Sequence, residues 1–375
     1  MLFFKHLRFS GFNDEWEIKM LKDVSTVNPK TKDLPNEFVY IDLDSVENGI
    51  LTKKNKICID DAPSRAQRLL DVNDILFQTV RPYQMNNLYF DYYDDNYVAS
   101  TGYAQIKSKI NSRYLYHYLH YSKFVNEVLK RCAGSSYPAI SSNDLKKIKI
   151  KIPSDLVEQM FIGSFFDKID EKIELLEKKH IYYQNFKKYL MQQIFAQKLR
   201  FANFEEDWST KKLGEIVEFL DNKRIPLNED ERNNQKDIYP YYGASGIIDY
   251  VEDYIFDEEL ILIGEDGTID VNLASGKYWV SNHAHVLRAS EDINQRYLFE
   301  FLKTVHFEIY NTGTIQPKLN KETCKTIPIK IPKSLEEQKL IANCLSKAEN
   351  RIEICQKQIN MTNNFKKGLL QQMFV

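Results

Sequence analysis

Two stretches of the chain place large side chains at the spacing of a long helix. In the first stretch, one set of residues recurs every seven positions: Ile162, Ile169, Leu176, Tyr183 and Leu190. A second set recurs at the same interval, four residues after the first: Phe166, Ile173, His180, Lys187 and Ile194. The second stretch has the same two sets: Ile341, Ala348, Cys355, Thr362 and Leu369, then Leu345, Ile352, Ile359, Lys366 and Met373. This spacing is typical of the a/d seam of a coiled coil. Each stretch predicts a helix of about forty residues, roughly 60 Å long.

The two stretches are copies of each other. A shift of 179 positions aligns residues 148–195 with residues 327–374 without a gap, with 21 identities in 48 positions. Each copy opens with an alternating run that ends at a proline, Pro153 or Pro332, and such a run predicts a short strand. The preceding segments are also related, in three pairs: LRFSGFNDEW and LRFANFEEDW, NSRYLYHYL and NQRYLFEFL, GSSYPAI and GTIQPKL. The unit is therefore a globular domain followed by a long helix, used twice.

The remaining pattern predicts the α+β class. Alternating runs such as EFVYIDL, DILFQTV, DEELILIG and KYWVSNHAHVLRA predict strands, and RYLYHYLHYSKFVNEVLK and RYLFEFLKTVHFEIY each predict an amphipathic helix. We assign the globular domains to residues 1–150 and 199–330 and the long helices to residues 151–198 and 331–375. Such a stripe can be ordinary core packing, but helices this long exceed what a small domain can cover. We expect them to pack as an antiparallel coiled coil with pseudo-twofold symmetry.

Composition narrows the class of protein. The 375 residues are 43% apolar and 28% charged, as in globular proteins, and no run is long and apolar enough to span a bilayer. The five cysteines form no CxxC pair, which argues against disulfides and zinc. We expect a cytoplasmic protein without a membrane partner. Residues 202–321 hold 12 basic and 23 acidic residues, and an acidic surface repels the phosphates of DNA. If this segment binds DNA, either its acidic residues face away from the DNA, or partner proteins supply most of the contacts to the DNA backbone.

Motifs of catalysis are missing from the sequence. It has no GxxxxGK[ST] loop and no Asn-Pro-Pro-aromatic motif of an adenine methyltransferase. His283 and His285 form an HxH pair without a nearby carboxylate in sequence, a weak sign of a metal site. Glu265 and Asp266 suggest nuclease carboxylates, but they lack the lysine that should follow, and a turn is the better interpretation. We expect no catalytic residue and no bound metal or cofactor in this chain.

A long, nearly twofold object with two different heads suits duplex DNA. Arg, Asn, Gln, Ser, Thr and similar side chains can present hydrogen bonds to base edges. The candidates in the first domain are Gln78, Arg81, Tyr83, Gln84, Asn86, Asn87, Ser135, Ser136 and Tyr137. Those in the second domain are Lys223, Arg224, Tyr241, Tyr242, Ser245, Thr268, Asn282, His283, Thr314, Gln316 and Lys318. The alternative for each is an exposed loop residue or a local turn contact.

The two long helices carry a second set of candidates. Lysine and glutamine recur at matched places on both, and a partner could dock there twice: Lys187, Lys188 and Gln192, and Lys366, Lys367 and Gln371. The alternative is a solvated helix face.

Several sequence motifs together resemble the specificity subunits of type I restriction-modification enzymes. They are LRFxxFxxxW at the head of each unit, YPYYGASGIIDYVEDYIFDEELILIGEDG from Tyr239, SNHAHVLR from Ser281, and IPxxLxEQ before each long helix. The resemblance covers nearly the whole chain. It implies that residues 1–150 and 199–330 are target-recognition domains and that the helices at 151–198 and 331–375 are the family's conserved helices.

The resemblance also implies the function. A non-catalytic subunit of this family reads a bipartite site in double-stranded DNA, one half per recognition domain, with two methyltransferase subunits and, in the full complex, motor-nuclease subunits. S-adenosylmethionine, ATP and Mg²⁺ are then expected in those partners, which perform adenine-N6 methylation and ATP-dependent cleavage. The alternative is a non-catalytic coiled-coil scaffold whose heads bind protein.

Overall fold

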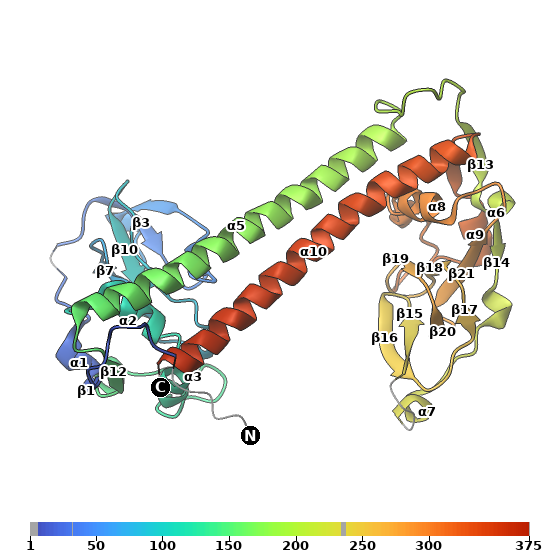
Figure 1. Cartoon of the computed structure of the whole chain (residues 1–375). Coiled ribbons are helices and arrows are strands. Elements are labelled where there is room, and N and C mark those ends of the chain that lie inside the picture. Colours follow the sequence, from blue (N-terminus) through green and yellow to red (C-terminus); the bar gives the residue numbers. More distant parts are fainter. Residues whose placement is uncertain (1–6, 32, 234–237, 375) are drawn as a thin grey trace. The chain divides into compact units, whose positions relative to one another are not determined.

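The computed structural model describes residues 7–31, 33–233 and 238–374 of the chain, which divides into two compact units (Figure 1). Unit 1 contains the described residues of 1–177 and 357–375, and unit 2 contains those of 178–356. Both divisions fall inside the long helices, so each unit combines one globular head with parts of both. We call residues 7–153 head 1 and residues 199–332 head 2.

The two predicted long helices are present at the predicted length. Helix α5 spans Leu156–Phe195, 40 residues, and α10 spans Leu335–Met373, 39 residues. In unit 1, Ile162 and Phe166 near the start of α5 share a core with Met373 at the end of α10. In unit 2, Ile194 near the end of α5 shares a core with Ile341 near the start of α10. The helices therefore pack antiparallel within each unit, and the predicted fold class is confirmed.

Head 1 consists of two four-stranded sheets, two strand pairs and short helices. The sheets have the orders β2-β11-β8-β9 and β6-β3-β10-β7, and β1 pairs with β12. The strands are β1 Glu17–Met20, β2 Ser25–Val27, β3 Glu37–Ile41, β4 Val46–Glu47, β5 Ile50–Leu51, β6 Asn55–Cys58, β7 Ala66–Leu69, β8 Ile75–Gln78, β9 Leu88–Tyr89, β10 Tyr97–Ser100, β11 Tyr103–Ser108 and β12 Lys149–Ile152. The helices are α1 Leu21–Val24, α2 Ser112–Tyr118, α3 Ser122–Leu129 and α4 Ser142–Lys146, with 3-10 turns η1 Ile59–Asp61 and η2 Pro82–Gln84.

The described residues of head 2 repeat this topology except for the pair that β4 forms with β5 in head 1. Its sheets have the orders β14-β21-β18-β19 and β16-β15-β20-β17, and β13 pairs with β22. The strands are β13 Ser209–Lys212, β14 Val217–Phe219, β15 Tyr239–Gly243, β16 Gly246–Val251, β17 Phe256–Asp257, β18 Leu260–Gly264, β19 Val271–Ala274, β20 Lys277–Val280, β21 Ala284–Ala289 and β22 Pro328–Ile331. The helices are α6 Leu213–Ile216, α7 Glu229–Asn233, α8 Gln295–Leu302 and α9 Lys321–Lys325, with 3-10 turns η3 Asp221–Lys223 and η4 Phe307–Tyr310. Each head has one parallel pair, β3 with β10 and β15 with β20.

Three sequence predictions are corrected because the chain turns inside them. The helix predicted at 113–130 is two helices, α2 and α3, because the amide of Tyr121 bonds the carbonyl of Tyr118, and this tight turn places Tyr121 and Phe124 in the core. The helix predicted at 296–310 ends as α8 at Leu302, and a 3-10 turn follows. The strand predicted at 277–289 is β20 and β21, separated by a turn at 281–283.

The repeated LRF and W residues tie the start of each head to the start of the long helix that follows it. In unit 1, Arg8 holds both carboxylate oxygens of Glu158 at 2.7 and 2.8 Å, and the indole of Trp16 donates to the same carboxylate at 3.3 Å. The same three residue types recur in unit 2, where Arg200 binds Glu337 at 2.8 and 3.0 Å and Trp208 donates at 3.3 Å. A bidentate pair of this kind fixes orientation as well as neutralising the buried carboxylate.

The glutamine of the repeated LxEQ motif joins the same corner to the next helix. The amide of Gln159 donates to the carbonyl of Pro153 at 2.8 Å and accepts from the backbone of Asn111 at 3.0 Å. Asn111 in turn caps α2 by accepting from Tyr114, as asparagine commonly does at this position. Gln338, Pro332 and Asn294 repeat these contacts in unit 2.

The last aromatic residue of each repeat closes the core of a head. Phe374 is 1% exposed and lies 5.1 to 6.5 Å, between ring centroids, from Trp16, Tyr114, Tyr118 and other rings of unit 1. Phe195, the equivalent residue, packs on Tyr297 in unit 2. The end of each long helix is therefore part of the core of a head.

We expect Phe374→Ala to lower the free energy of unfolding by about 3–5 kcal/mol, because it empties a filled aromatic site. Phe365→Ala is the control, since that ring is 58% exposed, and it should cost under about 0.5 kcal/mol. Denaturant unfolding of the two variants measures both values. Equal stability of the two would show that the end of α10 does not support the core of unit 1.

Candidate nucleic-acid interface

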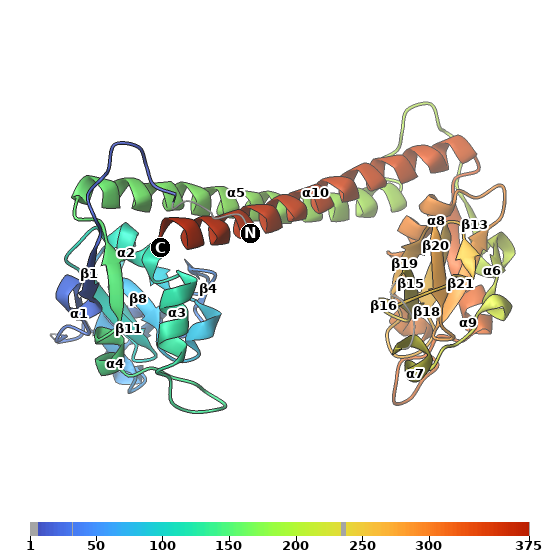
Figure 2. The same ribbon diagram turned by 60° about the horizontal axis from the view of Figure 1, so that its bottom comes forward.

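The predicted DNA-contacting segments lie beside one another in each head through the same backbone bonds. In head 1 the amide of Arg81 donates to the carbonyl of Pro138 at 2.7 Å, and the amide of Ile140 donates to Thr79 at 3.0 Å. In head 2 Gly267 donates to Pro317 at 2.9 Å and Leu319 donates to Glu265 at 2.8 Å. We call residues 79–87 and 133–139 the reading loops of head 1, and residues 265–270 and 312–318 those of head 2. Figure 2 shows the connection between α3 and α4 extending from head 1 on the side away from α5.

A glycine shapes one reading loop in each head. Gly134 has a φ of +91°, a conformation that L side chains rarely adopt. A Cβ on Gly313 would lie 1.9 Å from the carbonyl oxygen of Gln316, so no other residue fits without a shift of the loop. The GSSYP and GTIQP segments therefore make tight turns of similar placement with different side chains at their tips.

Two head 1 candidates are buried, which corrects their predicted place at the surface. Gln78 and Asn87 are each 1% exposed. The carbonyl of the Gln78 side chain accepts from the backbone of Asn86 at 3.1 Å, and its amide donates to the Gln84 side chain at 2.8 Å. The Asn87 side chain accepts from the backbone of Gln78 at 2.8 Å. These bonds position the loop, and the buried amides are not presented to a ligand in this conformation.

The other head 1 candidates are accessible. Arg81 lies with its guanidinium 4.4 Å from the centre of the Tyr137 ring, and Tyr137 is 63% exposed. Tyr83, Gln84, Ser135 and Ser136 are exposed, and Asn86 is half-buried. The accessible candidates therefore come from both reading loops of the head.

Head 2 brings its candidates together but pairs its cations with acids. Arg224 donates to the carboxylate of Glu265 at 3.0 Å and to the carbonyls of Asn282 and Ala284 at 3.1 and 2.7 Å. This corrects its predicted role as an available donor, because its side chain is 14% exposed and already engaged. Lys223 and Asn282 are exposed beside it.

Asp266 lies among the predicted DNA-contacting residues, although the sequence analysis interpreted it only as part of a turn. Its carboxylate lies 3.2 Å from the ammonium of Lys318 and 3.5 Å from the imidazole of His283, both predicted to contact DNA. Thr268, Thr314 and Gln316 are exposed in the same loops. The sequence signal for the acidic residues of this loop is the GED segment at the end of β18. The positions of the two cations beside Asp266 follow only from the fold.

The YYGAS candidates divide between core and surface. Tyr241 is 2% exposed, and its hydroxyl accepts from the backbone of Leu227 at 3.2 Å, which corrects its prediction as a surface residue. Tyr242 is half-buried and Ser245 is exposed. This segment adjoins the reading loops, because a Cβ on Gly264 would lie 2.8 Å from the carbonyl oxygen of Ala244.

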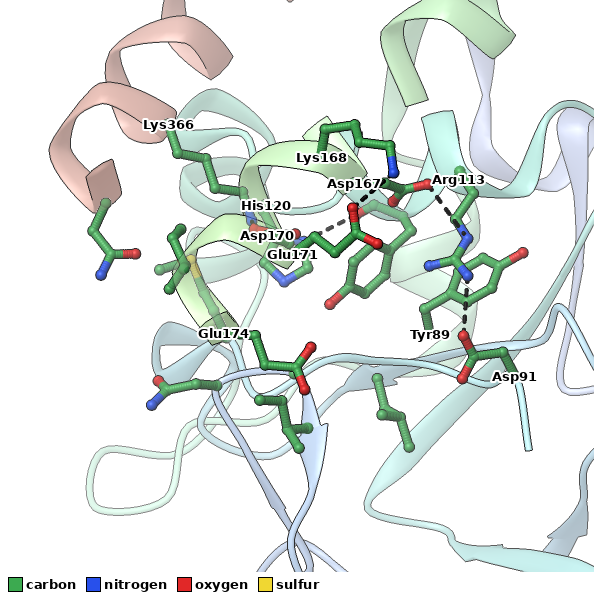
Figure 3. Close-up of a pocket in the computed structure, with 18 of the residues that line it drawn as sticks. Tyr89, Asp91, Arg113, His120, Asp167, Lys168, Asp170, Glu171, Glu174 and Lys366 are labelled. Carbon is green, nitrogen blue, oxygen red and sulfur yellow. Dashed lines mark hydrogen bonds and ion pairs between the residues drawn. The ribbon is translucent and has the colours of Figure 1, made fainter. Parts of the chain in front are cut away.

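A cleft of about 780 Å³ separates α5 from the body of head 1 (Figure 3). Its α5 side carries one lysine, Lys168, and five acidic residues, Asp167, Asp170, Glu171, Glu174 and Glu177. Arg113 of the head lies against the ring of Tyr89, 3.5 Å from its centre, and pairs with Asp91 at 3.0 Å. Burial lowers the pKa of His120 at its edge to about 3, so that imidazole is neutral near pH 7. A predominantly acidic lining is unsuited to a phosphate backbone.

Unit 2 has an equivalent cleft of about 380 Å³. Its lining includes Arg296, Glu349 and Glu353, which correspond in the repeat to Arg113, Asp170 and Glu174. The two units therefore present similar clefts beside their long helices as well as different reading loops.

Comparison with known proteins identifies the family. The profile of the "Type I restriction modification DNA specificity domain" matches residues 13–182 and 205–363. The chain belongs to this type I restriction-modification specificity family. The putative type I specificity subunit MjaX of Methanocaldococcus jannaschii is 22% identical to this chain, over 98% of this chain and 94% of its own length. The type I specificity subunit MjaIX of the same organism is 24% identical, over 99% of this chain and 95% of its own length. The resemblance predicted from the motifs is confirmed.

Other relatives of the specificity family match locally or by fold. A putative type I specificity subunit of Haemophilus influenzae is 37% identical over 133 residues, 34% of each chain. The chain spans 38% and 42% of the lengths of two further relatives, the EcoprrI and MjaVIII subunits of Escherichia coli and M. jannaschii. The crystal structure of the type I S subunit from M. genitalium has a TM-score of 0.68 at 16% identity and covers 98% of this chain and 97% of that one. The fold is thus that of a specificity subunit.

Lys187 does not lie on the surface of this specificity-family chain, which corrects its prediction as a docking residue. It is 5% exposed, and its ammonium lies 2.7 Å from Glu349 and 3.0 Å from Glu300. Burial opposes its charge, but the hydrogen bonds to the two carboxylates outweigh burial and raise the pKa of Lys187. Its repeat equivalent Lys366, on α10, pairs with Asp170 of α5 at 2.5 Å, and Asp170 lies 3.8 Å from the buried His117 of head 1. Lys366 therefore joins the two long helices, whereas Lys187 also joins α5 to head 2 through Glu300.

The exposed partner candidates are Lys188, Gln192, Lys367 and Gln371. Another feature of the long helices was missed: an apolar stripe, defined as Leu175, Tyr182 and Phe186 on α5 and Ile354, Met361 and Phe365 on α10, all exposed. The three α5 residues each lie 179 positions before the corresponding α10 residue, so the stripe is part of the repeat. On each helix the three residues are spaced by seven and then four positions, which places them on one helix face. The helical spacing of seven and four residues that predicts the coiled-coil seam also identifies this stripe in the sequence.

Across the part of the chain that the structure describes, no helix is both long and apolar enough to cross a membrane.

We expect Lys187→Ala to lower the free energy of unfolding by about 3–5 kcal/mol, because it leaves the 3% exposed carboxylate of Glu300 without its cation. Lys188→Ala is the matched control, since that neighbour is exposed and should be near neutral. Urea unfolding followed by circular dichroism distinguishes the two. If Lys187→Ala is as stable as the parent, the buried pair does not hold α5 to head 2.

Proposed function

We propose that this chain is the non-catalytic DNA-specificity subunit of a type I restriction-modification complex. Each head reads one half of a bipartite site in double-stranded DNA, and the chain directs methyltransferase and endonuclease partners to that site. In this proposal the length of the long helices governs the number of unread base pairs between the half-sites.

One observation carries this proposal: the heads share their frame and differ where they read. The Arg8–Glu158 and Arg200–Glu337 corners are alike, and the reading loops are held by equivalent backbone bonds. The side chains that these loops expose are different, with Tyr137 in head 1 where Gln316 stands in head 2. A constant frame with variable loop tips is the arrangement that two readers of different sequence require.

The matched surfaces of the two long helices support the binding of two copies of one partner. The apolar stripe and the two clefts occur once per repeat, so identical partners would meet similar chemistry at both. Exposed aliphatic and aromatic side chains at helical spacing suit an amphipathic partner helix. The exposed Lys–Gln positions, Lys188 and Gln192 with Lys367 and Gln371, lie on another face of the same helices and could add polar contacts.

The chemistry of the complex belongs to those partners in this proposal. The methyltransferase subunits would bind S-adenosylmethionine and methylate adenine, and the motor-nuclease subunits would use ATP and Mg²⁺. The acidity of head 2 and the acid-paired cations in its loops support a division in which partners supply much of the attraction to phosphates.

The direct test maps N6-methyladenine by long-read sequencing in cells that express the methyltransferase partner with and without this chain. We expect a split motif, methylated on both strands, only when the chain is present. If the map is unchanged although the chain is folded and bound to its partner, the chain is a scaffold whose heads bind protein.

A second test concerns the apolar stripe. We expect the double variant Phe186→Glu/Phe365→Glu to weaken association with the methyltransferase by roughly thirtyfold or more, because buried aromatic contacts dominate such interfaces. Tyr93→Glu is the control, since Tyr93 is 80% exposed but lies in head 1. Size-exclusion chromatography and titration of the purified subunits measure the loss, and unimpaired assembly of the double variant would exclude the stripe as the docking face.

A further inference from the structure

The reading loop of head 1 holds an arginine in a backbone conformation that only glycine adopts freely. Arg81 has φ and ψ of 53° and 53°, and Met85, after the short η2 turn, has φ and ψ of 54° and 28°. Such left-handed conformations are strained for residues with a side chain, and strain of this kind tends to occur at functional sites. The network around Gln78 and the bond from Arg81 to Pro138 hold this geometry in place.

The side chain of Arg81 is positioned but not neutralised. Its guanidinium lies 4.4 Å from the centre of the Tyr137 ring. Three arginines of head 1 pair with acids, Arg8, Arg113 and Arg131, whereas Arg81, like Arg65 and Arg68, has no carboxylate partner among the described residues. Contact with the ring does not use the N–H groups of the guanidinium, so they stay available for acceptors. The ring also limits the rotamers of the arginine, which reduces the entropy lost on binding.

Head 2 shows what this loop is like without the arginine. Gly267 takes the place of Arg81 and makes the same backbone bond to a proline carbonyl, with a φ of +84°. A Cβ on Gly267 would meet nothing within 4 Å, so the equivalent direction is open. The fold therefore needs a left-handed residue at this position but does not need a guanidinium there.

We propose that Arg81, stacked on Tyr137, reads a guanine in the half-site of head 1. Two parallel acceptors in one plane suit the guanidinium fork, and guanine O6 and N7 in the major groove provide them. This inference rests on the proposed function and specifies which base class that head requires. Head 2 lacks this contact because Gly267 and Gln316 stand at the equivalent positions.

The test uses the full chain with its methyltransferase partner and the methylation map described above. Arg81→Gly removes the guanidinium while glycine keeps the left-handed backbone, as Gly267 does in head 2. We expect one guanine of one half-site to become degenerate, with its preference reduced about ten- to hundredfold, and the other half-site to stay unchanged. Tyr137→Ala should relax the same base pair to a smaller extent. Arg131→Ala removes the same charge two residues before the reading loop that carries Tyr137, and it should leave the motif unchanged.

The outcomes separate the two levels of the argument. If the parent chain yields no split motif, the proposed function fails. If it does, and Arg81→Gly lowers methylation equally at all sites or leaves the motif intact, Arg81 contacts a phosphate or nothing, and the guanine assignment is overturned. The assignment is also overturned if Arg81→Gly and Tyr137→Ala relax different base pairs. A thermal unfolding midpoint matching that of the parent confirms that each variant is folded.

Discussion

A carboxylate buried at the start of each long helix is the contact on which both units depend. Glu158 and Glu337 are each 1% exposed, and a charge in such a place must be paired and hydrogen-bonded. Arg8 or Arg200 does so from the first residues of the head, and a tryptophan adds a further bond. One ionic group thereby fixes the beginning of a head, the strand pair and the helix entry at a single corner. The repeated sequence motifs are the parts of that corner.

The fixed corner explains where the two heads are free to differ. Equivalent backbone bonds hold the reading loops to one another in both heads, so replacing Arg81 by glycine or Tyr137 by glutamine leaves the same bonds possible, as head 2 shows. Side chains whose amides are buried, such as Gln78, belong to the support of the loop. The exposed side chains of the reading loops can therefore differ between the heads without a change of fold.

Periodicity and repetition in the sequence predict the long helices, their antiparallel pairing and several strands of the two heads, because those features depend on local pattern. The break between α2 and α3 is not predicted, since it comes from tertiary packing of Tyr121 and Phe124 and carries no glycine or proline signal. Burial of Lys187 and engagement of Arg224 are also missed, because both depend on acids distant in sequence, Glu349 and Glu265. Long-range partners of charged residues cannot be derived from spacing alone.

The bond at the first described residue of the chain has a counterpart in its middle. The amide of Leu7 donates to the carbonyl of Gln372 at 3.2 Å, and the amide of Leu199 donates to that of Gln193 at 3.1 Å. In unit 2 those residues are joined by six peptide bonds, whereas in unit 1 the same contact forms between opposite ends of the sequence. Covalent continuity is thus dispensable for this contact. Because each partner belongs to a different repeat in unit 1, a chain with one repeat has the groups to make the same bond to a second copy of itself.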